Sequence, residues 1–260
     1  MPVPLLTLLT LTACQERIDP PTDVPAVYPG EAWSEIVERA STSDGVDWKI
    51  LQDNYDTLRQ LLAWIAENGP ETRRVSETRE GDRLAALLNA HNAVVIDAVL
   101  RFSLPLETPT ELLRAPGRST RRDLLWRIDN EWITLDRLAY HRLLAIFQDP
   151  MVHAGLFRAT ATGPRLRWYR AGDVSGELGV NMGEWLNSDR GLRAVGDGYA
   201  LNGYLLDHEA DFLEWGASPT LCAWMMEQTI GARRAWLTTH IGDCPLQRFE
   251  VDEHLDMLGR

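Results

Sequence analysis

Two long apolar stripes with helical spacing constrain the fold of this chain more than any other feature. The first stripe consists of Leu51, Tyr55, Leu58, Leu62 and Ile65. The second consists of Leu84, Leu88, His91, Val95, Ala98 and Phe102. Residues that recur at intervals of three and four lie on one face of a helix, and Asn68, Gly69 and Pro70 form a helix stop after the first stripe. The sequence therefore predicts helices over about 46–65 and about 78–102 that pack together.

Shorter patterns predict further helices and a few strands. Helical spacing or capping residues predict helices over 33–40, 108–114, 135–147 and 178–185. A further helix is expected to begin at Pro219, with Ser218 as its cap, and to include Trp236 near its end. Aromatic, β-branched or alternating residues favour strands at 131–134, 166–170 and 247–251. We expect an α+β fold, a mainly helical single domain with a small sheet. Most of the ten tryptophans lie on the apolar stripes, so we expect core packing for them, with a sugar-binding platform as the alternative.

Composition favours a single domain and argues against nucleic acid as a partner. With 260 residues of which 45% are hydrophobic, the chain can bury a full core, and we expect a single domain over 31–260. The formal net charge of -12 argues against nucleic acid, because such binding needs a positive field that neutralises phosphates. No sequence pattern calls for a cofactor.

The first 30 residues resemble the start of a bacterial lipoprotein. An apolar stretch leads to Leu11, Thr12 and Ala13 directly before Cys14, as in the lipobox whose cysteine is acylated. We expect a signal segment over 1–13, a Pro-rich stalk over 14–30, and an outer-membrane lipoprotein that faces the periplasm, with the lipid on Cys14 as its tie to the membrane. An ordinary secretory signal or a buried strand is the alternative. The stretch is short and has no basic residue before it, which is untypical of a signal peptide.

The other two cysteines, Cys222 and Cys244, would then lie in an oxidising compartment. Two interpretations stay open. The two thiols can pair in a disulfide, or Cys244, which precedes Pro245, can be a nucleophile.

Several segments, taken in order, resemble the bacterial domain-of-unknown-function family 547. AALLNAHNAVV is similar to the family's AFWINxYNA and keeps Asn89, Asn92 and Ala93. ITLDRL at 133–138 and DPMVHAGL at 149–156, which contains His153, resemble LTLDxIEH and DPRIHFAL. LNGYLLDHEADF at 201–212 and VDEHLD at 251–256 resemble two later family segments, so the resemblance covers roughly 45–256.

The resemblance implies a thiol hydrolase with a papain-like fold, and this chain departs from that pattern. Family members carry two cysteines after the DPRIH segment, whereas Arg158 and Gly163 stand at those positions here. The family's Glu-His dipeptide falls on Ala139 and Tyr140, and His141 is displaced by one position, which turns it by about 100° on a helix. Without the sulfur a thiol mechanism has no nucleophile, so a pseudoenzyme is expected.

Three polar residues remain as weak candidates for a site. Asn89 and Asn92 lie three residues apart and share a helix face, where they can either tie the helix to irregular backbone or form a polar site with His153. No metalloprotease, phosphate-loop, serine-hydrolase or paired-cysteine zinc pattern occurs. A closing strand explains VDEHLD better than a metal site, so no metal is expected.

Three functions follow in order of preference. The first is a non-catalytic binding or structural domain in the envelope, with a protein or a glycan as its partner. The second is a hydrolase of an envelope peptide or glycan that uses His153 without a cysteine nucleophile. The third is a ligand-binding module built on exposed tryptophans, which predicts aromatic side chains that converge in a cleft.

Overall fold

The computed structural model describes residues 15–69, 79–102, 120–251 and 256, and confirms the α+β class. The described helices are α1 (Gly30–Ala40), α2 (Trp48–Asp53), α3 (Tyr55–Glu67), α4 (Glu80–Phe102), α5 (Thr120–Asp123), a π-helix (Arg137–Leu144), α6 (Ala145–Phe147), α7 (Val152–Gly155), α8 (Val174–Leu186), α9 (Gly203–Asp207), α10 (Glu209–Glu214), α11 (Leu221–Gln228) and α12 (Gly231–Thr239). The described strands are β1 (Glu16–Ile18), β2 (Ser41–Thr42), β3 (Gly45–Val46), β4 (Leu124–Ile128), β5 (Glu131–Ile133), β6 (Leu192–Val195), β7 (Gly198–Asn202) and β8 (Gln247–Phe249). The expected helix at 108–114 and the signal segment at 1–13 with Cys14 lie outside the described residues.

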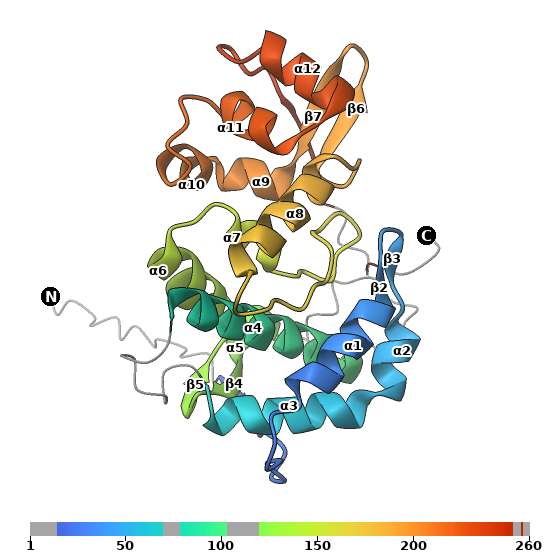
Figure 1. Ribbon diagram of the computed structural model, residues 1–260, viewed down its shortest axis with the longest axis vertical. Coiled ribbons are helices and arrows are strands. Elements are labelled where there is room, and N and C mark those ends of the chain that lie inside the picture. The colour runs from blue at the N-terminus through green and yellow to red at the C-terminus, as the bar shows by residue number, and fades with distance from the viewer. Residues whose placement is uncertain (1–14, 70–78, 103–119, 252–255, 257–260) are drawn as a thin grey trace, which may run out of the picture.

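Helix α4 is the central element of the larger hydrophobic core, with α1 and α3 on one side and α7 and α8 on the other (Figure 1). Glu80 and Asp82 in its first turn and Arg101 in its last complement the helix dipole. By length and composition it could cross a membrane, but 89% of its most apolar stretch is buried inside the fold. It is therefore the predicted core helix.

The helix expected over 46–65 is divided into α2 and α3. Asp47 caps α2 by accepting from the backbone N–H groups of Lys49 and Ile50. At Asn54 the backbone leaves the helical region, with φ −112° and ψ 23°, and the side chain donates to the Ile50 carbonyl. An asparagine that bonds the preceding turn competes with the helix, which explains the break.

The sequence predicts one small sheet, whereas the described residues form three small sheets. Strand order is β1-β4-β5 in the first, β2-β3 in the second and β6-β7-β8 in the third. In the first sheet, β1 pairs in parallel with β4, with Arg17 opposite Leu125. Three residues of the segment expected to be a stalk therefore form a strand of the folded body.

The prediction of a strand at 166–170 is wrong, because this segment bonds to side chains of α4 and not to another strand. Asn89 accepts from the Tyr169 N–H at 2.9 Å and donates to the Tyr169 carbonyl at 2.8 Å. One amide side chain thus satisfies both backbone groups of a residue, as a paired strand would. The segment runs as irregular backbone along the helix.

A second core lies among α8, α9, α10, α11 and α12, which form the upper part of the molecule in Figure 1. The helix expected to start at Ser218 begins instead after Thr220, whose side chain accepts from the Ala223 N–H. It divides into α11 and α12 around Gly231, which has φ +59°. Cys222 and Cys244 form a disulfide, 22 residues apart in the sequence, so Cys244 is not a free thiol.

The ends of two further predictions also differ from the structure. The helix expected over 135–147 contains a π-helix, with α6 after it. The strand expected at 247–251 ends at Phe249, and the closing strand over 251–256 is not formed at its described residues. Asp256 instead pairs with Arg190 at 2.6 Å and its carbonyl accepts from Trp48 Nε1.

Candidate functional site: an aromatic groove

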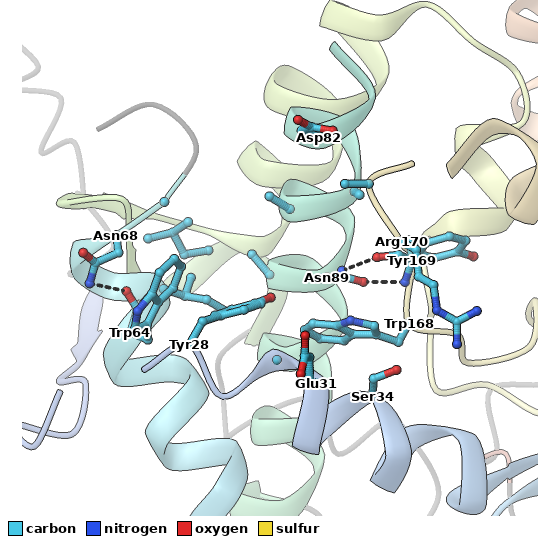
Figure 2. A pocket seen from close by; sticks show the side chains of 18 of the residues that line it. Tyr28, Glu31, Ser34, Trp64, Asn68, Asp82, Asn89, Trp168, Tyr169 and Arg170 are labelled. Carbon is cyan, nitrogen blue, oxygen red and sulfur yellow. Dashed lines mark hydrogen bonds between the residues drawn. The ribbon is translucent and has the colours of Figure 1, made fainter. Parts of the chain in front are cut away.

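A groove of about 1080 Å³ opens between α1, α3, α4 and the segment 168–171. Figure 2 shows its walls, with Tyr28 and Trp64 on one side and Trp168 on the other. These three aromatic residues come from three separate parts of the chain. Aromatic residues that converge in a concave site with a few polar groups are typical of ligand-binding sites.

The first aromatic wall is a ring pair. Tyr28 and Trp64 have ring centroids 4.6 Å apart and planes tilted by 51°. The side chain of Tyr28 is 41% exposed, so part of its ring faces the groove. The ring also lies directly over the first residue of α1, where a Cβ on Gly30 would collide with it. Glycine at this position therefore lets Tyr28 lie against Trp64.

The second wall is positioned by Asn89 on α4. Its two bonds to Tyr169 fix the backbone between Trp168 and Arg170 (Figure 2). Asn89 is only 4% exposed, so both bonds are buried. These buried bonds fix the Tyr169 backbone, which follows Trp168 directly in the chain.

The groove carries more negative than positive charge. Glu31, Glu35, Glu38 and Asp82 line it, together with the neutral Ser34 and Asn68. Its arginine, Arg170, bonds Glu38 at 2.6 Å and lies 3.6 Å from Glu177. The groove therefore offers hydrogen-bond acceptors at its edge and aromatic faces on its walls.

Asn92, the second candidate of the same helix, also binds irregular backbone. It donates to the Gly155 carbonyl at 3.0 Å and accepts from the Phe157 N–H at 3.1 Å. The shared face predicted for Asn89 and Asn92 thus receives two stretches of irregular backbone, the segment after α7 and the segment at 168–170. These bonds match the structural role, in which the two amides hold irregular backbone against the helix, and not a polar site with His153.

His153 does not line the groove. It lies on α7 with no exposed surface. Its Nδ1 is 2.8 Å from the Tyr204 hydroxyl, and its Nε2 is 3.0 Å from one carboxylate oxygen of Asp211. His208 approaches the same oxygen of Asp211 through Nδ1 at 3.3 Å. The expected polar site of His153 with Asn89 and Asn92 is therefore not formed, and His153 belongs to a separate histidine–aspartate cluster.

Two of the positions that depart from the family pattern, Tyr140 and Arg158, contact residues of this cluster or its neighbour Tyr204. Tyr140 stacks on His208 with ring centroids 5.8 Å apart, and the guanidinium carbon of Arg158 lies 4.2 Å from the centroid of the Tyr204 ring. His141 is exposed. A Cβ added at Gly163 would be 2.8 Å from Thr160 Oγ1, so a larger side chain there requires Thr160 to move.

Sequence reasoning missed the residues that the structure brings together. Tyr28 falls in the expected stalk, and nothing in its sequence environment links it to Trp64 or Trp168. His208 and Asp211 are three residues apart in the segment DHEADF, a spacing that places two side chains on one helical face. That spacing was a usable signal, whereas their proximity to His153 depends on the tertiary fold.

Comparison with known families identifies part of the chain. Residues 75–186 match the family described as "Protein of unknown function, DUF547". This confirms the predicted resemblance over the stretch that contains Asn89, Asn92 and His153. Comparisons with curated proteins and with solved structures give no match. The papain-like fold and the resemblance beyond residue 186 stay predictions.

Proposed function

We propose that this protein is a non-catalytic binding domain that holds a glycan chain in the groove between α1, α3, α4 and the segment 168–171. The observation that carries the proposal is the convergence of Tyr28, Trp64 and Trp168 on one concave surface. Sugar rings have apolar faces and polar edges, so aromatic walls with oxygen-rich borders complement them.

The arrangement of charge favours a neutral glycan over a basic peptide. Glu31 and Glu35 are exposed, so their attraction for a cationic side chain is weak and screened by salt. Glu38 is already paired with Arg170. The carboxylates serve better as acceptors for hydroxyl groups, and the aromatic faces provide most of the binding free energy.

The hydrolase alternative has less support from the geometry. General-base catalysis needs an imidazole nitrogen within hydrogen-bond reach of a substrate proton. Both ring nitrogens of His153 are engaged by Tyr204 and Asp211, and the ring is fully buried. The thiol pathway lacks a sulfur because Arg158 and Gly163 occupy the family's cysteine positions.

The proposed location is the bacterial envelope, with the chain attached through a lipid on Cys14. The apolar stretch that ends in Leu11, Thr12 and Ala13 directly before Cys14 supports this location. Because β1 begins at Glu16, only Gln15 separates the cysteine from the folded body. A lipid on Cys14 would therefore hold the groove close to the membrane surface, where envelope glycans are within reach.

The proposal is tested by calorimetric titration of the purified protein with neutral oligosaccharides of β-linked N-acetylhexosamines and with a basic peptide. We expect saturable oligosaccharide binding that changes little with salt. Trp168→Ala removes one aromatic wall and should weaken binding about 10-fold, since a loss of about 1.4 kcal/mol corresponds to that factor.

The matched control is Trp236→Ala, which removes a partly buried tryptophan on α12 that does not line the groove. It should leave binding unchanged. The proposal is wrong if no oligosaccharide binds while the peptide binds with strong salt dependence, or if the two tryptophan variants weaken binding equally.

A further inference from the structure

Two histidines and one aspartate meet at the junction of the two cores, away from the groove. Among the described residues, His153, His208 and Asp211 each offer one ligand atom, and these atoms all lie within 4.8 Å of one another. His153 comes from α7, His208 follows α9, and Asp211 lies on α10. The two nearer pairs share Asp211 Oδ2, at 3.0 Å from His153 Nε2 and 3.3 Å from His208 Nδ1.

These separations fit a tetrahedral metal ion. Zinc binds imidazole nitrogen and carboxylate oxygen at about 2.0–2.1 Å, which places neighbouring ligands of a tetrahedral site about 3.3 Å apart. Both distances to Asp211 are already close to that value. The two histidine nitrogens lie within 4.8 Å of each other and must approach to that tetrahedral separation when an ion binds.

A second layer of contacts holds His153 in the orientation that a ligand needs. Its Nδ1 lies 2.8 Å from the buried Tyr204 hydroxyl, which leaves Nε2 directed at Asp211. A hydroxyl can donate or accept, so it can receive the Nδ1–H once the Nε2 lone pair binds a metal. The rings of Phe212 and Trp215 lie 5.1 Å and 6.5 Å from the His153 ring and restrict its rotation.

The ligand set includes one carboxylate. Asp211 Oδ2 contacts both histidines, and a carboxylate among the ligands contributes negative charge that complements a cation.

The positive charge of Arg158 opposes a cation at this place, because its guanidinium lies over the Tyr204 ring beside the cluster. The Asp211 carboxylate contacts both histidines directly and supplies the opposite charge.

We infer that His153 Nε2, His208 Nδ1 and Asp211 Oδ2 form a zinc site with its fourth position open to water. Asp211 and His208 have side chains 24% and 20% exposed, so solvent reaches the cluster from their side. Two imidazoles and one carboxylate are a ligand set that zinc accepts. The site is independent of the proposed glycan groove, and it differs from the expectation, based on sequence motifs, that no metal is bound.

The experiment is a calorimetric titration of untagged, chelator-treated full-length protein with Zn²⁺, and with Co²⁺ as a visible-absorption probe of coordination. We expect one ion per chain, and a four-coordinate absorption spectrum with Co²⁺. His208→Gln and Asp211→Asn should each abolish this stoichiometric binding. Tyr204→Phe, which keeps the ring but removes the hydroxyl, should weaken binding about 10- to 100-fold.

Matched controls are His141→Gln, an exposed histidine, and Asp207→Asn, an exposed aspartate next to the cluster that pairs with Arg248. Both should bind Zn²⁺ as the unaltered protein does. Circular dichroism of every variant separates loss of a ligand from loss of the fold. The inference is overturned if folded protein binds no stoichiometric Zn²⁺, or if the variants at 208 and 211 bind it as well as the controls.

Discussion

At the scale of single residues, the side chains of α4 show what sequence spacing can and cannot predict. The interval of three predicts that Asn89 and Asn92 share a face, and both do bind backbone that packs on α4. Their backbone partners are 80 and 63 residues away in the sequence, so local periodicity cannot identify them. The sequence therefore predicts that these amides can bond irregular backbone, but not which backbone segments they bond.

Asn92→Ala should destabilise the fold strongly. It removes the side-chain partner of the Phe157 N–H, of the Gly155 carbonyl and of His91 Nδ1 in a buried region, and the first two keep only a bond of 3.2 Å to each other. Unsatisfied buried groups cost about 1–3 kcal/mol each, so we expect a loss of about 2–4 kcal/mol in the free energy of unfolding, measured with urea. Asn54→Ala, at a partly exposed site with one side-chain bond, is the control and should change it far less. An equal effect of both variants would contradict the assigned role of Asn92.

His91 predicts a specific pH dependence of stability. It is fully buried, and burial lowers its pKa to about 3, with the charges of Arg121 and Arg158 acting in the same direction. The hydrogen bond with Asn92 acts in the opposite direction. Because the folded-state pKa is below the unfolded value of about 6.5, the stabilisation is present above about pH 6.5 and is lost as the pH falls toward the folded pKa.

The measurement is the free energy of unfolding at pH 7 and at pH 5, for the unaltered protein and for His91→Phe. The single group accounts for a loss of about 2 kcal/mol over this interval. His91→Phe has no imidazole at this position, so its free energy of unfolding should fall by about 2 kcal/mol less than that of the unaltered protein between pH 7 and pH 5. Identical pH dependence in the two proteins would show that His91 is not neutral and buried in the folded state.

At the scale of secondary structure, long apolar stripes were the reliable signal. The stripe over 84–102 predicts α4 within a few residues, because a core helix must repeat its apolar face along its length. Short elements were less predictable. The segment 166–170 has the composition of a strand, yet its backbone bonds are satisfied by Asn89, a partner that no local pattern reveals.

The disulfide should stabilise the second core through α11 and the turn after α12. Cys222 and Cys244 enclose a loop of 22 residues in sequence separation, and a loop of that size gives about 3 kcal/mol in the chain-entropy model. The double variant Cys222→Ser with Cys244→Ser should lower the free energy of unfolding by about that amount. The comparison is made by denaturant unfolding, with the reduced unaltered protein as a second reference. A change below about 1 kcal/mol would contradict this role.

At the scale of the whole molecule, the candidate sites depend on tertiary contacts between distant segments. The groove joins Tyr28, from a segment expected to be a stalk, with Trp64 on α3 and Trp168 after α7. The histidine cluster joins α7 to α10 across the boundary of the two cores. The sequence indicates the residue types that such sites use, and the third hypothesis anticipated aromatic convergence in a cleft. It does not indicate which of the ten tryptophans converge.

The central claim, that the groove binds a glycan through its aromatic walls, is tested most directly by nuclear magnetic resonance. The ten tryptophans give ten indole N–H signals, which can be assigned by single substitutions and followed as an oligosaccharide of β-linked N-acetylhexosamines is added. The account predicts that the signals of Trp64 and Trp168 shift together and saturate, while that of Trp236 stays in place. Shifts confined to tryptophans outside the groove, or no shift at saturating oligosaccharide, would contradict it.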